Sequence, residues 1–212
     1  MKGWIARFVV ALSIASCMLP AAQARPWTRQ NYLTCRVTLV ISGNFFLCES
    51  ANGRENLVRM ADIEAPEPTQ PYGEEARRYL RDLIWQNKIS IKVRDQKDEK
   101  YENNENNENN DYVLGEIYYR KLNVNREMIR QGYAWANRKN TSSIYLRIER
   151  DAHSFGFGLW HDVEARYPAE FRRENPMDFE DLKKLAQERD EQIENEAASQ
   201  KSRNSSKAQT SR

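Results

Sequence analysis

Apolar residues recur at every second position early in the chain and predict a β-hairpin. The recurring positions are Val37, Leu39 and Ile41. An apolar run follows at residues 45–47, and the Ser-Gly-Asn sequence at residues 42–44 between the two stretches is typical of a tight turn. Together these features predict a hairpin over residues 36–48. A further apolar stretch at residues 57–63 predicts a third strand.

The next segments follow the 3.6-residue period of helices. Residues 76–84 place apolar side chains on one face and charged side chains on the other, which predicts an amphipathic helix. A second helix is predicted to be capped by Asn125 and to end near Gly132. A third is predicted over residues 144–155 and ends at Gly156.

Two more strands complete the expected set of elements. Residues 89–93 alternate between apolar and polar side chains, and residues 113–119 form another apolar stretch. The expected order is therefore three strands, a helix, two strands and two helices. Five short strands that cannot all be covered in a flat sheet predict an α+β, mainly β fold: a five-stranded OB-type barrel with three helices packed on it.

The first 24 residues have the pattern of a secretory signal peptide. A short basic start is followed by an apolar stretch and by small residues that end in Ala22-Gln23-Ala24. The apolar stretch is far shorter than the roughly 20 residues of a membrane-spanning helix. Cleavage after Ala24 predicts an exported protein, periplasmic or secreted. The alternative is a lipoprotein anchored at Cys17, because Ile14-Ala15-Ser16-Cys17 resembles a lipoprotein cleavage site.

Polar segments interrupt and follow the predicted barrel. Residues 102–110 repeat Glu-Asn-Asn three times and predict a solvated low-complexity loop, because they have no apolar face to bury. Residues 163–198 read as a polar linker and a charged C-terminal helix with a thin apolar stripe. Residues 199–212 are rich in Ser, Lys and Arg, and we expect them to be disordered.

Charge and cysteine content narrow the possible functions. The chain has 33 Lys and Arg against 31 Asp and Glu, and removal of residues 1–24 leaves 31 of each. Such a balance gives no general attraction to polyanions, so nucleic-acid binding would need a local basic patch. The same cleavage leaves two cysteines, Cys35 and Cys48, which flank the predicted hairpin. In an exported protein they are expected to form a disulfide.

Four short motifs in a fixed order resemble the staphylococcal nuclease (thermonuclease) family. They are Val58-Arg59-Met60 with Ile63-Glu64-Ala65-Pro66-Glu67, Tyr72-Gly73-Glu74-Glu75-Ala76, Val124-Asn125 with Arg130-Gln131-Gly132-Tyr133-Ala134, and Gly158-Leu159-Trp160. The resemblance places one such domain at residues 33–162. It implies an OB-type barrel with three helices, which agrees with the order of elements read from the periodicity.

The resemblance also implies a phosphodiesterase site that depends on calcium. Two arginines clamp the phosphate in this family, a glutamate is the proposed base, and carboxylates hold the calcium ion. Arg59 matches the first arginine and Glu67 the proposed base. Glu64 stands at a metal-binding Asp, and Asn44 stands where the family has a second metal-binding Asp.

Two of these positions depart from the family pattern. Asn44 offers only a neutral oxygen, and calcium affinity depends on the charge of the ligands. The second arginine is replaced by Asn103 or by Tyr112, depending on where the gap is placed, and no Lys or Arg occurs between Lys100 and Arg120. Lys100 is near enough in sequence to substitute for that arginine, but it orients phosphate poorly because it is a point charge.

These departures predict weak or absent nuclease activity, with calcium binding weak at best. We expect an exported domain that acts mainly as a binding module, for nucleic acid, an oligosaccharide or a protein, with Arg59 and Glu67 possible remnants that form a structural ion pair. One alternative is an active secreted phosphodiesterase with altered metal use. A second is an envelope scaffold whose C-terminal helix contacts a partner.

Overall fold

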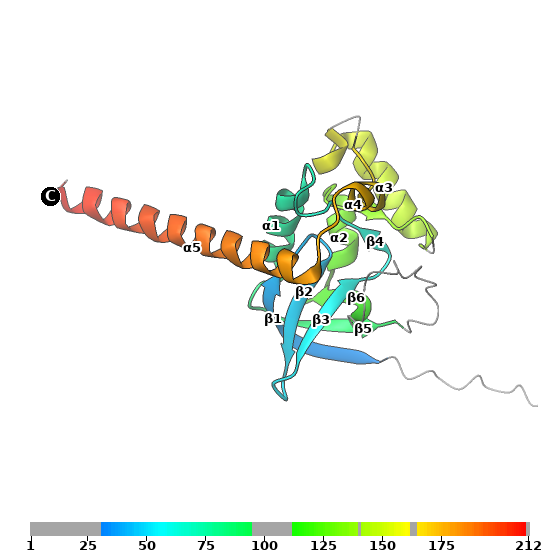
Figure 1. The fold of residues 1–212 in the computed structure, drawn as a ribbon, viewed down its shortest axis with the longest axis horizontal. Helices are drawn as coiled ribbons and strands as arrows, with labels where there is room; N and C mark the ends of the chain where they lie inside the picture. The colour runs from blue at the N-terminus through cyan, green and yellow to red at the C-terminus, as the bar shows by residue number, and fades with distance from the viewer. Residues whose placement is uncertain (1–30, 95–111, 140, 162–164, 211–212) are drawn as a thin grey trace, which may run out of the picture.

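The computed structural model describes residues 31–94, 112–139, 141–161 and 165–210, and a closed β-barrel lies at its centre (Figure 1). The barrel strands are β1 (Tyr32–Val40), β2 (Phe45–Ser50), β3 (Glu55–Met60), β5 (Lys88–Val93) and β6 (Val113–Tyr119). They pair in the order β3-β2-β1-β5-β6, and a parallel pairing of β3 with β6 closes the barrel. The predicted five-stranded OB-type barrel is confirmed.

The Cys35–Cys48 disulfide lies inside the barrel, across the hairpin that the alternation predicted. Val37 pairs with Cys48 and Cys35 pairs with Ser50, so the two cysteines are diagonal neighbours on β1 and β2. Their Cα atoms are 5.6 Å apart, a distance that suits a disulfide. Both cysteines are buried in the main hydrophobic core, so the bond joins the two strands from within.

Three helices pack on the barrel, as expected: α1 (Gly73–Ile84), α2 (Val124–Arg130) and α3 (Ser143–Phe155). The predicted cap of α2 is wrong by two residues. Asn123 is the N-cap, because its side chain accepts a hydrogen bond from the Arg126 backbone N–H. Asn125 is instead fully buried. It accepts from the Ile117 N–H and donates to the Ala61 carbonyl, which ties α2 to β6 and to the end of β3.

Short strands, a 3-10 helix and two C-terminal helices complete the fold. The bounds are β4 (Ile63–Glu64), β7 (Leu122–Asn123), β8 (Trp135–Ala136), the 3-10 helix η2 (Gly158–His161), α4 (Pro168–Glu174) and α5 (Phe179–Thr210). β4 pairs with β8, and β7 pairs antiparallel with the end of β6. Among the described residues, no helix is both long and apolar enough to cross a membrane.

The C-terminal helix α5 is longer than the sequence indicates. It continues to Thr210, whereas disorder was expected over residues 199–212, and only residues 211–212 lie outside the description. The stretch from 199 to 210 contains neither Gly nor Pro, so nothing in it ends a helix that has already begun. In Figure 1 the C-terminal half of α5 stands clear of the barrel.

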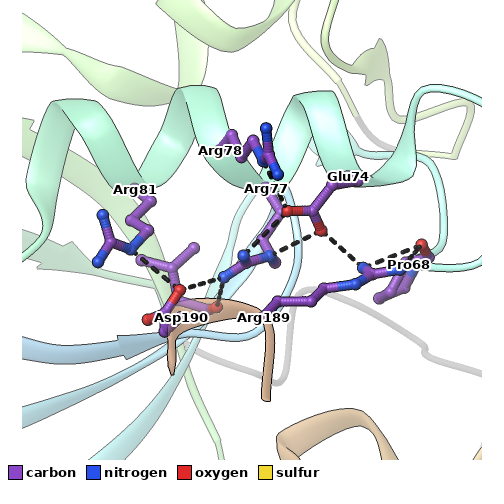
Figure 2. Close-up of polar contacts among 8 residues, drawn as sticks. Pro68, Glu74, Arg77, Arg78, Arg81, Arg189 and Asp190 are labelled. Atoms are coloured by element: carbon purple, nitrogen blue, oxygen red, sulfur yellow. Dashed lines mark hydrogen bonds and ion pairs between the residues drawn. The ribbon is translucent and has the colours of Figure 1, made fainter. Parts of the chain in front are cut away.

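The first half of α5 docks on the barrel through apolar and charged contacts. Ala186 is buried in a small apolar cluster with Leu39 and Leu47 of the β1–β2 hairpin. Figure 2 shows the charged part: the Asp190 carboxylate accepts hydrogen bonds from Arg77 and Arg81 of α1, at 2.7 and 3.0 Å. The Arg77 side chain is fully buried. The C-terminal helix is therefore part of the folded unit.

Arg189, the residue before Asp190 on α5, binds the loop before α1. Its guanidinium donates to the Pro68 carbonyl and lies 2.7 Å from Glu74, which also accepts from Arg77 and Arg78 (Figure 2). Because Pro68 is next to Glu67, α5 fixes the backbone beside the predicted base.

Candidate active site

Arg59 and Glu64 form a buried ion pair where β3 runs into β4. The Arg59 Nη2 to Glu64 Oε1 distance is 2.5 Å, and both side chains are less than one-tenth exposed. The chain turns sharply between them at Asp62, which has a positive φ of 65°, and this turn brings the two side chains together. Asn137, next to β8, donates to the same carboxylate at 3.5 Å.

Glu67 lies beside this pair but binds a different arginine. Arg172 of α4 donates from Nη1 to Glu67 Oε1 at 2.8 Å, and its Nη2 lies 3.8 Å from Glu64 Oε2. The structure therefore changes the expected partners: the structural ion pair of Arg59 is with Glu64. Sequence reasoning missed Arg172, because it lies 105 residues after Glu67 in a segment that reads as a polar linker.

Burial is the main influence on the pKa of Glu67. Desolvation raises the pKa of this carboxyl group above its ordinary value, and the positive charge of Arg172 opposes the shift. A carboxylate with a raised pKa accepts a proton more readily than an ordinary one. The net effect is a pKa of Glu67 above the ordinary value of a glutamate.

Asn44 lies in the loop beside Arg59. Its backbone carbonyl accepts from the Met60 N–H at 2.9 Å, and its side-chain oxygen accepts from the Ser42 hydroxyl at 3.1 Å. The Arg59 guanidinium lies 5.1 Å from the ring centre of Phe45, the residue after Asn44. The predicted site residues Asn44, Arg59, Glu64 and Glu67 therefore gather at one end of the barrel.

These residues do not fit a calcium site. Calcium in proteins is held by several oxygens from carboxylates, carbonyl groups and water, and its affinity depends on how many of them are charged. Asn44 is neutral, and Glu64 is already bound by Arg59, with Arg172 close to its second oxygen. Within the described residues, no three His, Cys, Asp or Glu side chains are grouped to hold a metal ion. The cations at this site are guanidinium groups.

The second arginine of the resemblance has no counterpart on β6. Tyr112, one of the two residues that can align with it, lies just before β6 and packs edge-on against Phe45, with ring centres 6.0 Å apart. Lys100, Asn103 and the repeat at residues 102–110 lie outside the described residues. Arg172 is the additional guanidinium that the fold brings to Glu67.

A second ionic cluster lies nearby, around Arg94 at the end of β5. One nitrogen of Arg94 donates to Asp62 and to Glu116, at 2.5 and 2.7 Å. Burial raises the pKa of Asp62, and Arg94 offsets this only in part. Burial would also raise the pKa of Glu116, but hydrogen bonds from Tyr118 and Arg94 hold it below its usual range. This cluster fixes the turn that carries Arg59 and Glu64.

Comparison with known proteins shows the family of this chain. A family model described as "Staphylococcal nuclease homologue" matches residues 57–162, half of the chain. The chain belongs to the staphylococcal nuclease family. The part matched by the nuclease-family model includes Arg59, Glu64 and Glu67. It excludes the Asn44 loop before it and Arg172 after it.

Three relatives show how far the similarity to other nuclease-family proteins extends. The chain is 33% identical over 147 residues to a Haemophilus influenzae protein named "Uncharacterized endonuclease", covering 69% of this chain and 76% of that protein. It is 31% identical over 119 residues to the "Micrococcal nuclease" of Shigella flexneri, covering 55% and 67%. It is 34% identical over 121 residues to "Protein ParB" of Escherichia coli, covering 56% and 67%.

Proposed function

We propose that this nuclease-family protein binds nucleic acid at the Arg59 site and hydrolyses phosphodiester bonds only slowly. The observation that carries the proposal is the gathering of Arg59, Glu64 and Glu67 at one end of the barrel. A guanidinium beside carboxylates can bind a phosphate oxygen and orient the attacking water. OB-type barrels commonly bind oligonucleotides at one face and its loops.

Three features predict slow hydrolysis: the pairing of Arg59 with Glu64, the missing second arginine and the neutral Asn44. Arg59 is held by Glu64 in a buried pair, so part of its charge is already neutralised. Neither candidate for the position of the second arginine, Asn103 or Tyr112, carries a positive charge, and Asn44 adds no charge for a metal ion. Loss of a transition-state arginine costs on the order of 10³ to 10⁵ in rate in related phosphoryl chemistry. The protein is therefore proposed to act chiefly as a binding module.

A second candidate function is an efficient phosphodiesterase with altered metal use. The raised pKa of Glu67 favours it, because a general base works best when its pKa lies near the working pH. The names of two relatives, an endonuclease and a micrococcal nuclease, point the same way.

We also propose that the protein is exported, to the periplasm or beyond. The support is the signal-peptide pattern of residues 1–24 and the Cys35–Cys48 disulfide, a bond that persists in oxidising compartments. Detection of the chain cleaved after Ala24 outside the cytoplasm would test this, and a lipid on Cys17 would support the anchored alternative.

The test of function is incubation of the purified protein with labelled single-stranded DNA and RNA, in calcium and in chelator. Arg59→Ala is the test variant, and Arg54→Ala, an exposed arginine on the β2–β3 turn, is the matched control. The proposal expects binding that Arg59→Ala weakens and Arg54→Ala does not, with little cleavage. Fast cleavage lost only in Arg59→Ala would establish the phosphodiesterase instead. Neither binding nor cleavage would overturn both and favour a scaffold role.

A further inference from the structure

We propose that Arg172 takes the place of the calcium ion in this nuclease-family site and that the site binds phosphate without metal. This inference rests on the proposed function for its phosphate ligand, but not for its claim about calcium. It assigns a role to a residue that lies outside the region shared with the family model.

The position of Arg172 carries the inference. Its guanidinium bridges Glu67, at 2.8 Å, and Glu64, at 3.8 Å. These are the two carboxylates for which the family resemblance implies the base and a metal ligand. A cation between two carboxylates removes the repulsion between them, which is what a metal ion at that place would do. Here an arginine side chain provides that positive charge.

The charge balance of the cluster disfavours an added cation. Arg59 and Arg172 bring two positive charges to the two negative charges of Glu64 and Glu67. A calcium ion would have to displace a guanidinium or sit beside it. Either event is costly, because Glu64 is buried and its pairing with Arg59 is close.

The Arg172 side chain is also able to contact a ligand. It is one-third exposed, whereas the Arg59 and Glu64 side chains are almost fully buried. A guanidinium has five N–H donors in a planar fork, and the bond to Glu67 uses one of them. The remaining donors suit a phosphate oxygen, for which arginine is well matched.

The chain holds α4 firmly in place, so Arg172 is prepositioned. Gln70, from the loop after Glu67, donates to the Arg166 carbonyl at 2.6 Å. Arg166, two residues before α4, makes two hydrogen bonds to Glu174, the last residue of that helix. Tyr167 packs edge-on against Trp135 of β8, which pairs with Glu64 in the sheet. These contacts connect α4 to the strands that carry the site.

The first test is a calcium titration of the full chain by calorimetry, with no nucleic acid present. The wild type is expected to show no calcium binding at millimolar calcium concentrations. The calcium affinity of Arg172→Ala is expected to be higher than that of the wild type by about tenfold or more, because the bridging positive charge is gone. Arg173→Ala, the neighbouring exposed arginine on α4, serves as the control and should match the wild type. Tight calcium binding by the wild type would overturn the inference, as would an Arg172→Ala variant that binds no calcium while remaining folded.

The second test measures the affinity of a fluorescein-labelled single-stranded DNA by anisotropy. Wild-type affinity should be the same in chelator and in calcium. Arg172→Ala should lose about tenfold in chelator, the usual effect of removing a charge-assisted hydrogen bond, and should regain part of it in calcium. Arg172→Lys, which keeps the charge, should lie between them. Equal losses for Arg172→Ala and Arg173→Ala would refute a role for Arg172 in phosphate binding.

The two tests separate failure of the inference from failure of the proposed function. If no variant binds DNA, the proposed function fails, and the calcium titration still decides whether Arg172 occupies the metal position. If all variants bind DNA alike and none differs in calcium affinity, the inference fails and the proposed function stands.

Discussion

Replacement of Asp190 tests how much the C-terminal helix contributes to the fold. Asp190 of α5 accepts hydrogen bonds from Arg77 and Arg81, and the Arg77 side chain is fully buried (Figure 2). Asp190→Ala removes the acceptor that these two arginines share. Arg77 keeps its two bonds to Glu74, but one of its buried nitrogens loses its charged partner.

The expected loss in the free energy of unfolding depends on the bonds to Glu74 that Arg77 keeps. Removal of one partner of a buried ion pair costs about 3–5 kcal/mol. Because Glu74 still neutralises Arg77 and the Asp190 side chain is 12% exposed, we expect the lower end, about 3 kcal/mol. The loss cannot exceed the free energy with which α5 docks, because Arg77 becomes solvated once the helix leaves.

The assay is urea unfolding followed by tryptophan fluorescence, together with limited proteolysis of α5. Trp85 reports on the contact directly, because the Arg81 guanidinium stacks on its ring at 3.6 Å. Glu191→Ala, the next residue on α5 and exposed, is the matched control. Asp190→Asn should fall between the two variants. If Asp190→Ala matches Glu191→Ala in both stability and protease resistance, the assignment of this contact as a major stabilising one is refuted.

Three further predictions concern the barrel and its site. Replacement of both Cys35 and Cys48 by Ala should lower the free energy of unfolding by about 3 kcal/mol, measured by urea titration, because the bond closes a short loop; a dithiol reductant should then have no further effect. Gly43→Ala should lower the melting temperature, at a cost of about 1–3 kcal/mol, because its Cβ would lie 2.7 Å from the Ala65 side chain; an unchanged melting temperature would contradict this packing. Burial raises the pKa of Glu67 above 4.5, so the stability that this group contributes is complete below its unfolded pKa and is lost as the pH rises through its folded pKa. Glu67→Gln should therefore be more stable than the wild type at neutral pH, and the difference should shrink in acid; a gain that is the same at every pH would exclude this cause.

The barrel could be predicted from the sequence because its signals are local. Alternation over residues 36–48 predicted the hairpin, and this hairpin makes Cys35 and Cys48 diagonal neighbours on its two strands. The helix at residues 76–84 showed its apolar face in the sequence. The cap of α2 was misplaced because Asn123 and Asn125 are equally good capping residues, and only the barrel beneath shows that Asn125 bonds to it.

The site was predictable only in part, because its completing contacts join distant segments. Arg59, Glu64 and Glu67 lie within nine residues of one another in a motif that can be recognised. Arg172 lies far along the chain in a polar stretch with no pattern of its own. Its role depends on where α4 packs, and that is decided by contacts such as Gln70 with Arg166. The sequence of a polar linker does not show which residues its charged side chains contact in the folded protein.

The contact between Arg77 and Asp190 also sets an order of folding. The two residues are 113 positions apart, so Arg77 leaves the ribosome long before its carboxylate partner has been made. A nascent chain that ends near residue 162 already contains all five barrel strands, yet one face of α1 still carries arginines that no aspartate neutralises. Helix α5 therefore completes the charge balance of α1, and the barrel reaches its full stability only after α5 has been synthesised.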